Sequence, residues 1–147
     1  MLEFQDIQRD LEKLRSTQDV LDTIVDASGA YGAVVFETGG EPVVEVGALE
    51  GDIAPLVGRI ASLWADSREV SRMIGEVSFE ETVYLAGSRH LLVTRCGLDH
   101  LLAVLFGGNT NLGLVRLYSG PASDHIATLL AADKPEIATV PDGEGSP

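Results

Sequence analysis

The sequence has one cysteine, few basic residues and no long apolar run. A single cysteine, Cys96, cannot form a disulfide framework or a thiolate metal cluster, so we expect a plain buried or half-buried thiol. The chain has 10 Lys and Arg residues and 23 Asp and Glu residues, which gives a formal net charge of −13. That charge disfavours nucleic acid and anionic membrane surfaces as partners. A basic patch on another protein fits it better.

The apolar runs are too short for a membrane span, which needs about 18 residues. Residues 1–15 are rich in charge and lack the apolar run of a signal peptide, so the expected location is the cytoplasm. A length of 147 residues with 45% apolar content suits one globular domain. Three of the six prolines fall in residues 133–147 without hydrophobic periodicity, which predicts a disordered tail.

The sequence makes a poor case for an enzyme. His90 and His100 lie on neighbouring predicted strands, where they would meet, but no further ligand follows at a regular spacing, so no metal site is expected. No Gly-x-Ser-x-Gly motif supports a catalytic serine. The stretch "GGNTNLG", 107–113, resembles a phosphate cradle but lacks the Lys-Ser/Thr pair, and we interpret it as a strand-to-helix turn. We therefore predict a protein without enzymatic activity or cofactor.

Hydrophobic periodicity and turn residues predict an α+β fold. A helix is expected over residues 2–27, with a break at Ser16-Thr17 where Ser16 and Asp19 fit a weak capping box. This helix packs either on its own sheet or, as a seam, on another helix. The remaining predicted elements are a hairpin of strands 31–38 and 43–47, a helix at 53–75, strands at 77–87, 89–96 and 100–108, and a helix from residue 110 that Gly120-Pro121 breaks or kinks. Together they predict a five-stranded antiparallel sheet with helices on its faces, in the order α-β-β-α-β-β-β-α.

The central helix carries two adjacent apolar surfaces. A wide arc of large residues is expected to pack on the sheet, with Val57 and Val70 at its edges. Beside it runs a stripe of small residues at spacings of four, three and four. The arc comprises Ile53, Leu56, Ile60, Leu63, Trp64 and Ile74, and the stripe comprises Ala54, Gly58, Ala61 and Ala65.

The small stripe has two explanations. Another part of the same chain covers it, or a second molecule does. Gly58 costs about 1 kcal/mol relative to alanine inside a helix, which indicates a packing reason. The stripe continues into Arg68, Glu69 and Arg72, and an apolar centre with a charged rim is typical of an interface. We therefore favour the intermolecular contact. The third strand, with Val83 and Leu85, is a candidate edge that two copies would share.

Four stretches of the chain resemble the Roadblock/dynein-light-chain domain, and more closely its bacterial MglB-type members. They are "GAYGAVVFETGGEPVVEVG" (29–47), "MIGEVSFEETVYLAGSRHLLV" (73–93), "HLLAVLFGGNTNLGLVRLY" (100–118) and the small-residue central helix. The resemblance covers residues 17–132 and implies a Roadblock-like (profilin-like) domain there. Residues 1–16 then form an N-terminal helical extension, and residues 133–147 form the tail.

The resemblance implies a homodimer that regulates a Ras-like small GTPase of the MglA type. It implies that the third strands pair into one continuous sheet and that the GTPase lies across the two central helices. It also implies activation by remodelling of the GTPase's own catalytic groups, without an arginine finger. The implied GTPase-binding residues are Ala61, Ala65, Arg68, Glu69 and Arg72, and the predicted dimer interface comprises Ala54, Gly58, Trp64, Val83 and Leu85.

Two other functions remain open at the level of the sequence. The same dimer is a scaffold if it binds partners without changing GTP hydrolysis. A small-molecule sensor is a third alternative, and it requires a pocket lined by residues such as Leu92, Ala103 and Leu105.

Overall fold

The computed structural model describes residues 3–47, 52–108 and 110–133. Within these ranges, helices and strands follow one another in the order α-α-β-β-α-β-β-β-α. In chain order they are α1 (Phe4–Glu12), α2 (Thr17–Ser28), β1 (Gly32–Glu37), β2 (Pro42–Gly47), α3 (Ala54–Met73), β3 (Glu81–Ala86), β4 (Arg89–Cys96), β5 (His100–Gly107) and α4 (Leu112–Asp133).

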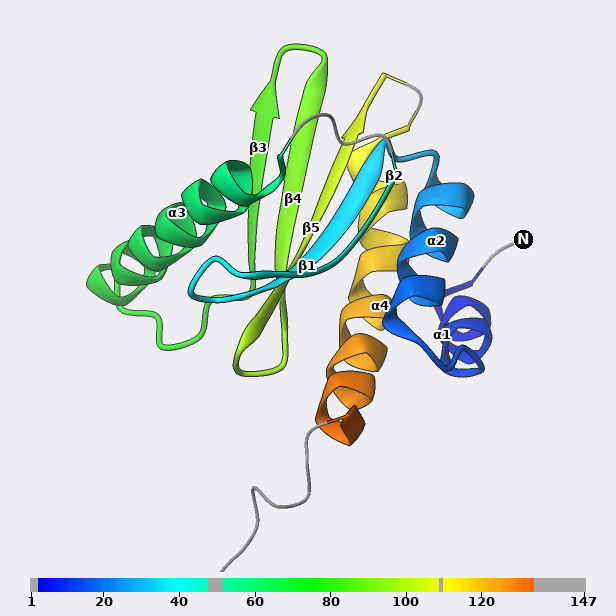
Figure 1. The fold of residues 1–147 in the computed structure, drawn as a ribbon. Helices are drawn as coiled ribbons and strands as arrows, with labels where there is room; N and C mark the ends of the chain where they lie inside the picture. Colours follow the sequence, from blue (N-terminus) through cyan, green and yellow to red (C-terminus); the bar gives the residue numbers. More distant parts are fainter. Residues whose placement is uncertain (1–2, 48–51, 109, 134–147) are drawn as a thin grey trace, which may run out of the picture.

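The strands form one antiparallel sheet in the order β2-β1-β5-β4-β3. The predicted fold class is therefore confirmed. Figure 1 shows α3 on one face of the sheet and α1, α2 and α4 on the other. β2 and β3 are the two edge strands, so β3 lies at the end of the sheet farthest from β2.

Alternation along the strands divides the core into two layers. On β1, Val35 faces the layer under α1, α2 and α4, whereas Val34 and Phe36 face the layer under α3. Trp64 fills the second layer and packs against Phe79, with ring centroids 4.6 Å apart. Both faces of β1 are buried, which explains its nearly continuous run of apolar residues.

The two N-terminal helices pack within their own chain. The predicted break is confirmed, and the Ser16 hydroxyl accepts a hydrogen bond from the Asp19 N–H at 3.1 Å. Ile7 and Leu11 of α1 are buried in the same layer as α2 and α4. His125 Nε2 on α4 lies 2.7 Å from the Leu14 carbonyl oxygen just after α1. The expected packing on its own sheet is thus observed for α2, whereas α1 packs on the helix α4 of the same chain.

Local signals set both ends of α3. Asp52 accepts a hydrogen bond from the Ala54 N–H at 3.1 Å, which satisfies one of the free N–H groups at the start of the helix. At the other end, Gly75 has φ +97°. The N–H groups of Gly75 and Glu76 donate to the carbonyls of Arg72 and Ser71, each at 3.0 Å. This is the Schellman arrangement, which satisfies the last carbonyls of a helix.

The structure corrects two predicted elements. The third strand begins at Glu81, four residues later than expected, because only from there does the chain pair with β4. The last helix continues through Pro121 as a single element. Proline removes one N–H donor, and buried neighbours such as Ala122 and Ile126 hold this segment against the sheet. The predicted tail, from residue 134 onward, lies outside the described residues.

The core under α3 gives a first prediction. Trp64→Ala should lower the free energy of unfolding by about 3–5 kcal/mol, because it empties a large, fully enclosed site. Ser62→Ala, an exposed position on the same helix, is the matched control and should change the stability by less than about 0.5 kcal/mol. Urea denaturation followed by circular dichroism measures both. A small loss for Trp64→Ala would show that Trp64 is not a core residue.

Candidate functional site

α3 is rotated relative to the prediction. Its buried line is Ile53, Val57, Ile60, Ala61 and Trp64. The other large residues of the predicted arc are exposed: Leu56 is 42% exposed, Leu63 45%, Val70 57% and Ile74 75%. The expectation of packing on the sheet is wrong for Val70 and Ile74, which are mostly exposed, whereas Leu56 and Leu63 are more than half covered and lie beside the buried line. Apolar residues span more than half the helix circumference, so the sequence alone does not decide which side faces the sheet.

The small stripe is covered in part by its own chain. The turn between β1 and β2 lies against it, and a Cβ added at Gly40 would be 3.3 Å from the Gly58 Cα. Ala61 is only 8% exposed and belongs to the core. The same-chain explanation is therefore the observed one for Ala61, against our preference. At Gly58 the turn lies close to the backbone, but an added Cβ would meet open space, so the turn does not require a glycine there. Ala54 and Ala65 are exposed.

An open groove runs along the opposite flank of α3, between its second half and β3. Its volume is about 450 Å³. Leu63, Val70 and Ile74 line it from α3, and Phe79 and Tyr84 line it from the chain leading into and along β3. Partial burial raises the pKa of Tyr84, and the neighbouring Ser67 side chain opposes this rise with a smaller effect. The groove is thus mostly apolar and continuous with the sheet edge.

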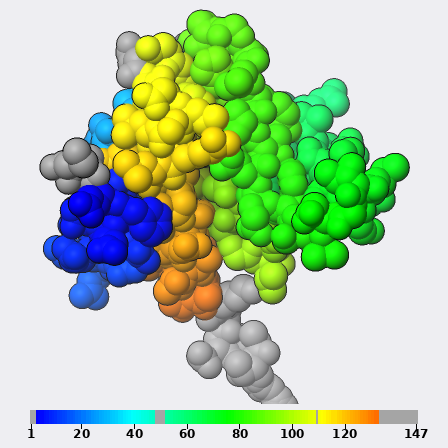
Figure 2. Space-filling view, turned by 180° about the vertical axis from the view of Figure 1, so that it is seen from behind, coloured from blue at the N-terminus to red at the C-terminus, as the bar shows by residue number. Residues whose placement is uncertain are grey.

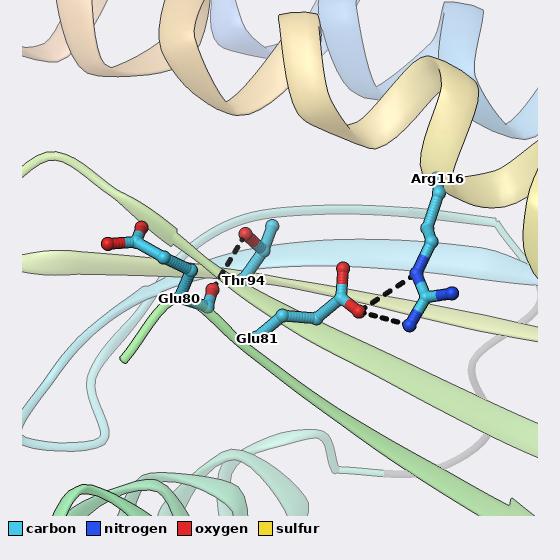
Figure 3. A network of polar contacts seen from close by, with 4 residues as sticks. All are labelled: Glu80, Glu81, Thr94 and Arg116. Carbon is cyan, nitrogen blue, oxygen red and sulfur yellow. Dashed lines mark hydrogen bonds and ion pairs between the residues drawn. The ribbon is translucent and has the colours of Figure 1, made fainter. Parts of the chain in front are cut away.

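β3 is an edge strand held from both faces. Within the described ranges it pairs with β4 and with no other strand, so its outer N–H and C=O groups are open. On the α4 face, Arg116 Nε donates to Glu81 Oε2 at 2.8 Å, and the second Arg116 nitrogen donates to the same oxygen (Figure 3). The Glu81 carboxylate raises the pKa of the Arg116 guanidinium.

The exposed apolar surface extends onto this edge. Leu85 is 68% exposed, whereas Val83 is half-buried against the α4 face of the core. Figure 2 shows the surface of β3 and its neighbours, in green, beside α4. An uncovered edge with an exposed leucine is an aggregation hazard unless a partner covers it.

The predicted GTPase-facing residues fall into two groups. Ala65, Arg68, Glu69 and Arg72 are exposed on α3, on or beside the small-residue flank, and so share one accessible surface. Arg72 forms an ion pair with Glu69 at 2.9 Å. Ala61, in contrast, has almost no surface to offer a partner. Trp64, placed in the predicted dimer interface, is 3% exposed and buried in its own core.

Other chemistry is sparse in the described part of the chain. No group of three or more His, Cys, Asp or Glu residues there is placed to hold a metal ion. His90 pairs with Phe106 and His100 with Cys96, so the histidines lie near opposite ends of the β4–β5 pair and do not meet.

Cys96 is a buried free thiol, as predicted, and burial raises its pKa to about 12. Among the described helices, none is long and apolar enough to cross a bilayer.

The residues proposed to line the pocket of a small-molecule sensor do not form one pocket. Leu92 belongs to the core layer on the α4 face, whereas Ala103 belongs to the layer under α3. The cavity that Ala103 and Leu105 line has a volume of about 10 Å³. That is room for a single water at most, whereas ligand pockets are typically about 300–1,000 Å³.

Comparison of the fold with solved structures gives clear matches. The gliding protein MglB from Thermus thermophilus aligns with a TM-score of 0.75 and 24% identity, over 79% of this chain and 89% of that chain. Myxococcus xanthus MglB aligns with a TM-score of 0.74 and 25% identity, over 79% and 95%. The chain has the Roadblock/MglB fold.

More distant matches agree with this Roadblock/MglB-like fold. A Roadblock/LC7 domain from Streptomyces avermitilis aligns with a TM-score of 0.61 and 20% identity, over 83% of this chain and 98% of that chain. Profilin II from Acanthamoeba castellanii aligns with a TM-score of 0.57. A further solved structure is described as MglB with a tetrameric arrangement. Protein-family models and curated proteins give no match.

Sequence reasoning missed the groove and the exposed flank beside it. The signal was present: Leu56, Leu63 and Val70 recur every seven residues, and Ile74 follows four residues later. A seven-residue repeat forms a second apolar line on a helix, separate from the line that faces the sheet. Leu63, Val70 and Ile74 of that line, together with the β3 edge, form the candidate interaction surface, which we call the α3–β3 face.

The contact between Gly40 and Gly58 gives a second prediction. Gly58→Ala should stabilise the protein by about 1 kcal/mol, because its added Cβ meets open space and alanine favours a helix. Gly40→Ala should destabilise it by about 1–3 kcal/mol, since Gly40 has φ +100° and its Cβ would crowd α3. Thermal unfolding compares the two variants. Destabilisation by Gly58→Ala would show that another group approaches this helix closely.

Proposed function

We propose that this protein is a non-enzymatic, homodimeric regulator of a Ras-like small GTPase of the MglA type. The observation that carries the proposal is the α3–β3 face: an open strand edge beside an exposed apolar helix flank, in the fold of MglB. The proposed activity is stimulation of GTP hydrolysis by remodelling of the partner's own catalytic groups.

The residues exposed on the α3–β3 face support the proposed dimer. Pairing of two β3 strands would satisfy their open backbone groups and bury Leu85. It would also bring Leu63, Val70 and Ile74 of each copy toward the other. We therefore assign the dimer interface to these residues with Val83 and Leu85. Ala54 and Gly58, on the other flank of α3, and the buried Trp64 are not part of this proposed interface.

The proposed GTPase-binding surface is the outer side of the paired α3 helices. Ala65 allows close approach of another backbone, and Arg68, Glu69 and Arg72 supply charges around it. Arg72 is already paired with Glu69, which suits a rim contact better than a catalytic role. The alternative function, a dimeric scaffold, uses the same surface but leaves the rate of hydrolysis unchanged.

Ala65→Arg tests the binding surface. The position is exposed, so the fold should survive, while the added cation should weaken binding of an MglA-like GTPase from the same organism at least about tenfold, the equivalent of 1.4 kcal/mol. Ala27→Arg places the same side chain at an exposed site on α2 and should bind normally. Calorimetry measures binding, and phosphate release measures hydrolysis.

The outcomes separate the two functions. Binding with faster hydrolysis supports a regulator, and binding with unchanged hydrolysis supports a scaffold. If the wild-type protein neither binds the GTPase nor changes its turnover, the proposal is wrong. Equal binding by the two arginine variants would place the interface elsewhere.

Val70→Asp tests the dimer. A carboxylate in the apolar α3 flank should shift the protein from dimer to monomer in sedimentation velocity, because burying an unpaired charge is strongly unfavourable. Val43→Asp is the matched control on the opposite edge strand, β2, where the residue is also partly exposed. The control should remain dimeric. A dimer that survives Val70→Asp contradicts the proposed interface.

A further inference from the structure

The side-chain alternation of β3 restricts how two copies can pair. Tyr84 faces the core layer under α3, whereas Val83 faces the layer under α4. Glu81 also points to the α4 face, where Arg116 binds it (Figure 3). Thr82 therefore shares a face with Tyr84, and Leu85 shares a face with Val83.

Symmetry adds a second restriction. If two β3 strands pair antiparallel with both α3 helices on one face of the joint sheet, the twofold axis is perpendicular to that sheet. Residues directly opposite in an antiparallel pair point to the same face. A shift of the register by one residue would set a side chain on the α3 face opposite one on the α4 face, which an antiparallel pair does not allow. The axis must therefore pass beside a residue that opposes its own copy, and not midway between two residues.

We call the residue that lies opposite its own copy the centre of the pairing. Only two choices of centre allow most of the strand to pair. β3 has six residues, from Glu81 to Ala86. A centre at Val83 pairs residues 81–85 with 85–81, and a centre at Tyr84 pairs residues 82–86 with 86–82, so each pairs five of the six. Centres at Thr82 or Leu85 pair three.

The chemistry of the opposing side chains distinguishes these two centres. A centre at Val83 sets Leu85 opposite Glu81, a carboxylate already bound to Arg116. A centre at Tyr84 sets Leu85 opposite Val83, and Thr82 opposite Ala86. Leu85 is largely exposed in the single chain and has the most apolar surface to bury. Apolar cross-strand pairs stabilise a sheet, so the Tyr84 centre is favoured.

We infer that the second copy pairs with β3 in the register that sets Tyr84 opposite the same tyrosine of its partner. This inference rests on the homodimer of the proposed function and specifies its geometry. Since Tyr84 and Ser67 line the same groove, the axis also passes near the second half of α3. The groove lies on the β3 side of α3, so the two grooves face each other across the axis and bring Leu63 and Val70 of both copies together.

Disulfide trapping tests the register. Tyr84→Cys and Val83→Cys are prepared separately and oxidised mildly at equal concentration, with the wild type as control because its only thiol, Cys96, is buried. A disulfide requires Cα atoms about 4.4–6.8 Å apart. The Tyr84 register predicts covalent dimer for Tyr84→Cys at least about threefold above Val83→Cys, because directly opposite Cα atoms are about 4.5–5.5 Å apart.

A second pair of variants keeps Tyr84 in place. Val83→Cys is mixed with a tagged Leu85→Cys chain, and the tag identifies the mixed covalent dimer on a gel. The inferred register predicts that this mixed dimer dominates over either self-linked species. The alternative register instead predicts self-linked Val83→Cys.

The results separate failure of the inference from failure of the proposed function. Trapping mainly at Val83→Cys, or a wild-type dimer with no trapping in any combination, overturns the register but leaves the dimer intact. A wild-type protein that sediments as a monomer overturns the proposed homodimer and the register with it.

Discussion

The narrow buried line on α3 is the constraint on which the rest of this structure depends. Ile53, Val57, Ile60 and Trp64 hold the helix on the sheet, and the small Ala61 is buried beside them. Once that rotation is fixed, the large residues on one flank point toward the β3 edge, and the small residues on the other flank receive the β1–β2 turn. The rotation of α3 thus separates an exposed flank of large apolar residues from a flank of small residues that its own chain covers in part.

The two edges of the sheet differ in a way that favours partner binding at only one of them. β2 begins with Pro42 and exposes Glu45, features that discourage addition of another strand. β3 instead exposes Leu85 and is held in position by the Glu81–Arg116 ion pair on one face and by Tyr84, which packs against the core under α3, on the other. A strand anchored on both faces is a preorganised template for pairing.

The charge on α3 differs from that of the rest of the chain. The chain carries a net charge of −13, yet α3 holds three of its ten cations, Arg59, Arg68 and Arg72. With Asp66 and Glu69 on the same helix, α3 is close to neutral on an otherwise acidic protein. Such a difference in potential orients an approaching partner more than it adds affinity. The proposed GTPase surface and the proposed dimer face lie on different flanks of this helix.

The sequence by itself determined the elements whose signals are local. Strand alternation and turns predicted the β1–β2 hairpin and the three later strands, and Ser16 marked a helix end. Asp52 and Gly75 close the ends of α3 in the same local way, through backbone hydrogen bonds within a few residues. The tertiary structure decided the rotation of α3, the cover over Gly58 and the passage of α4 through Pro121. Those features depend on contacts between segments far apart in the chain, and a helix with apolar residues on several sides does not reveal which side another segment will bury.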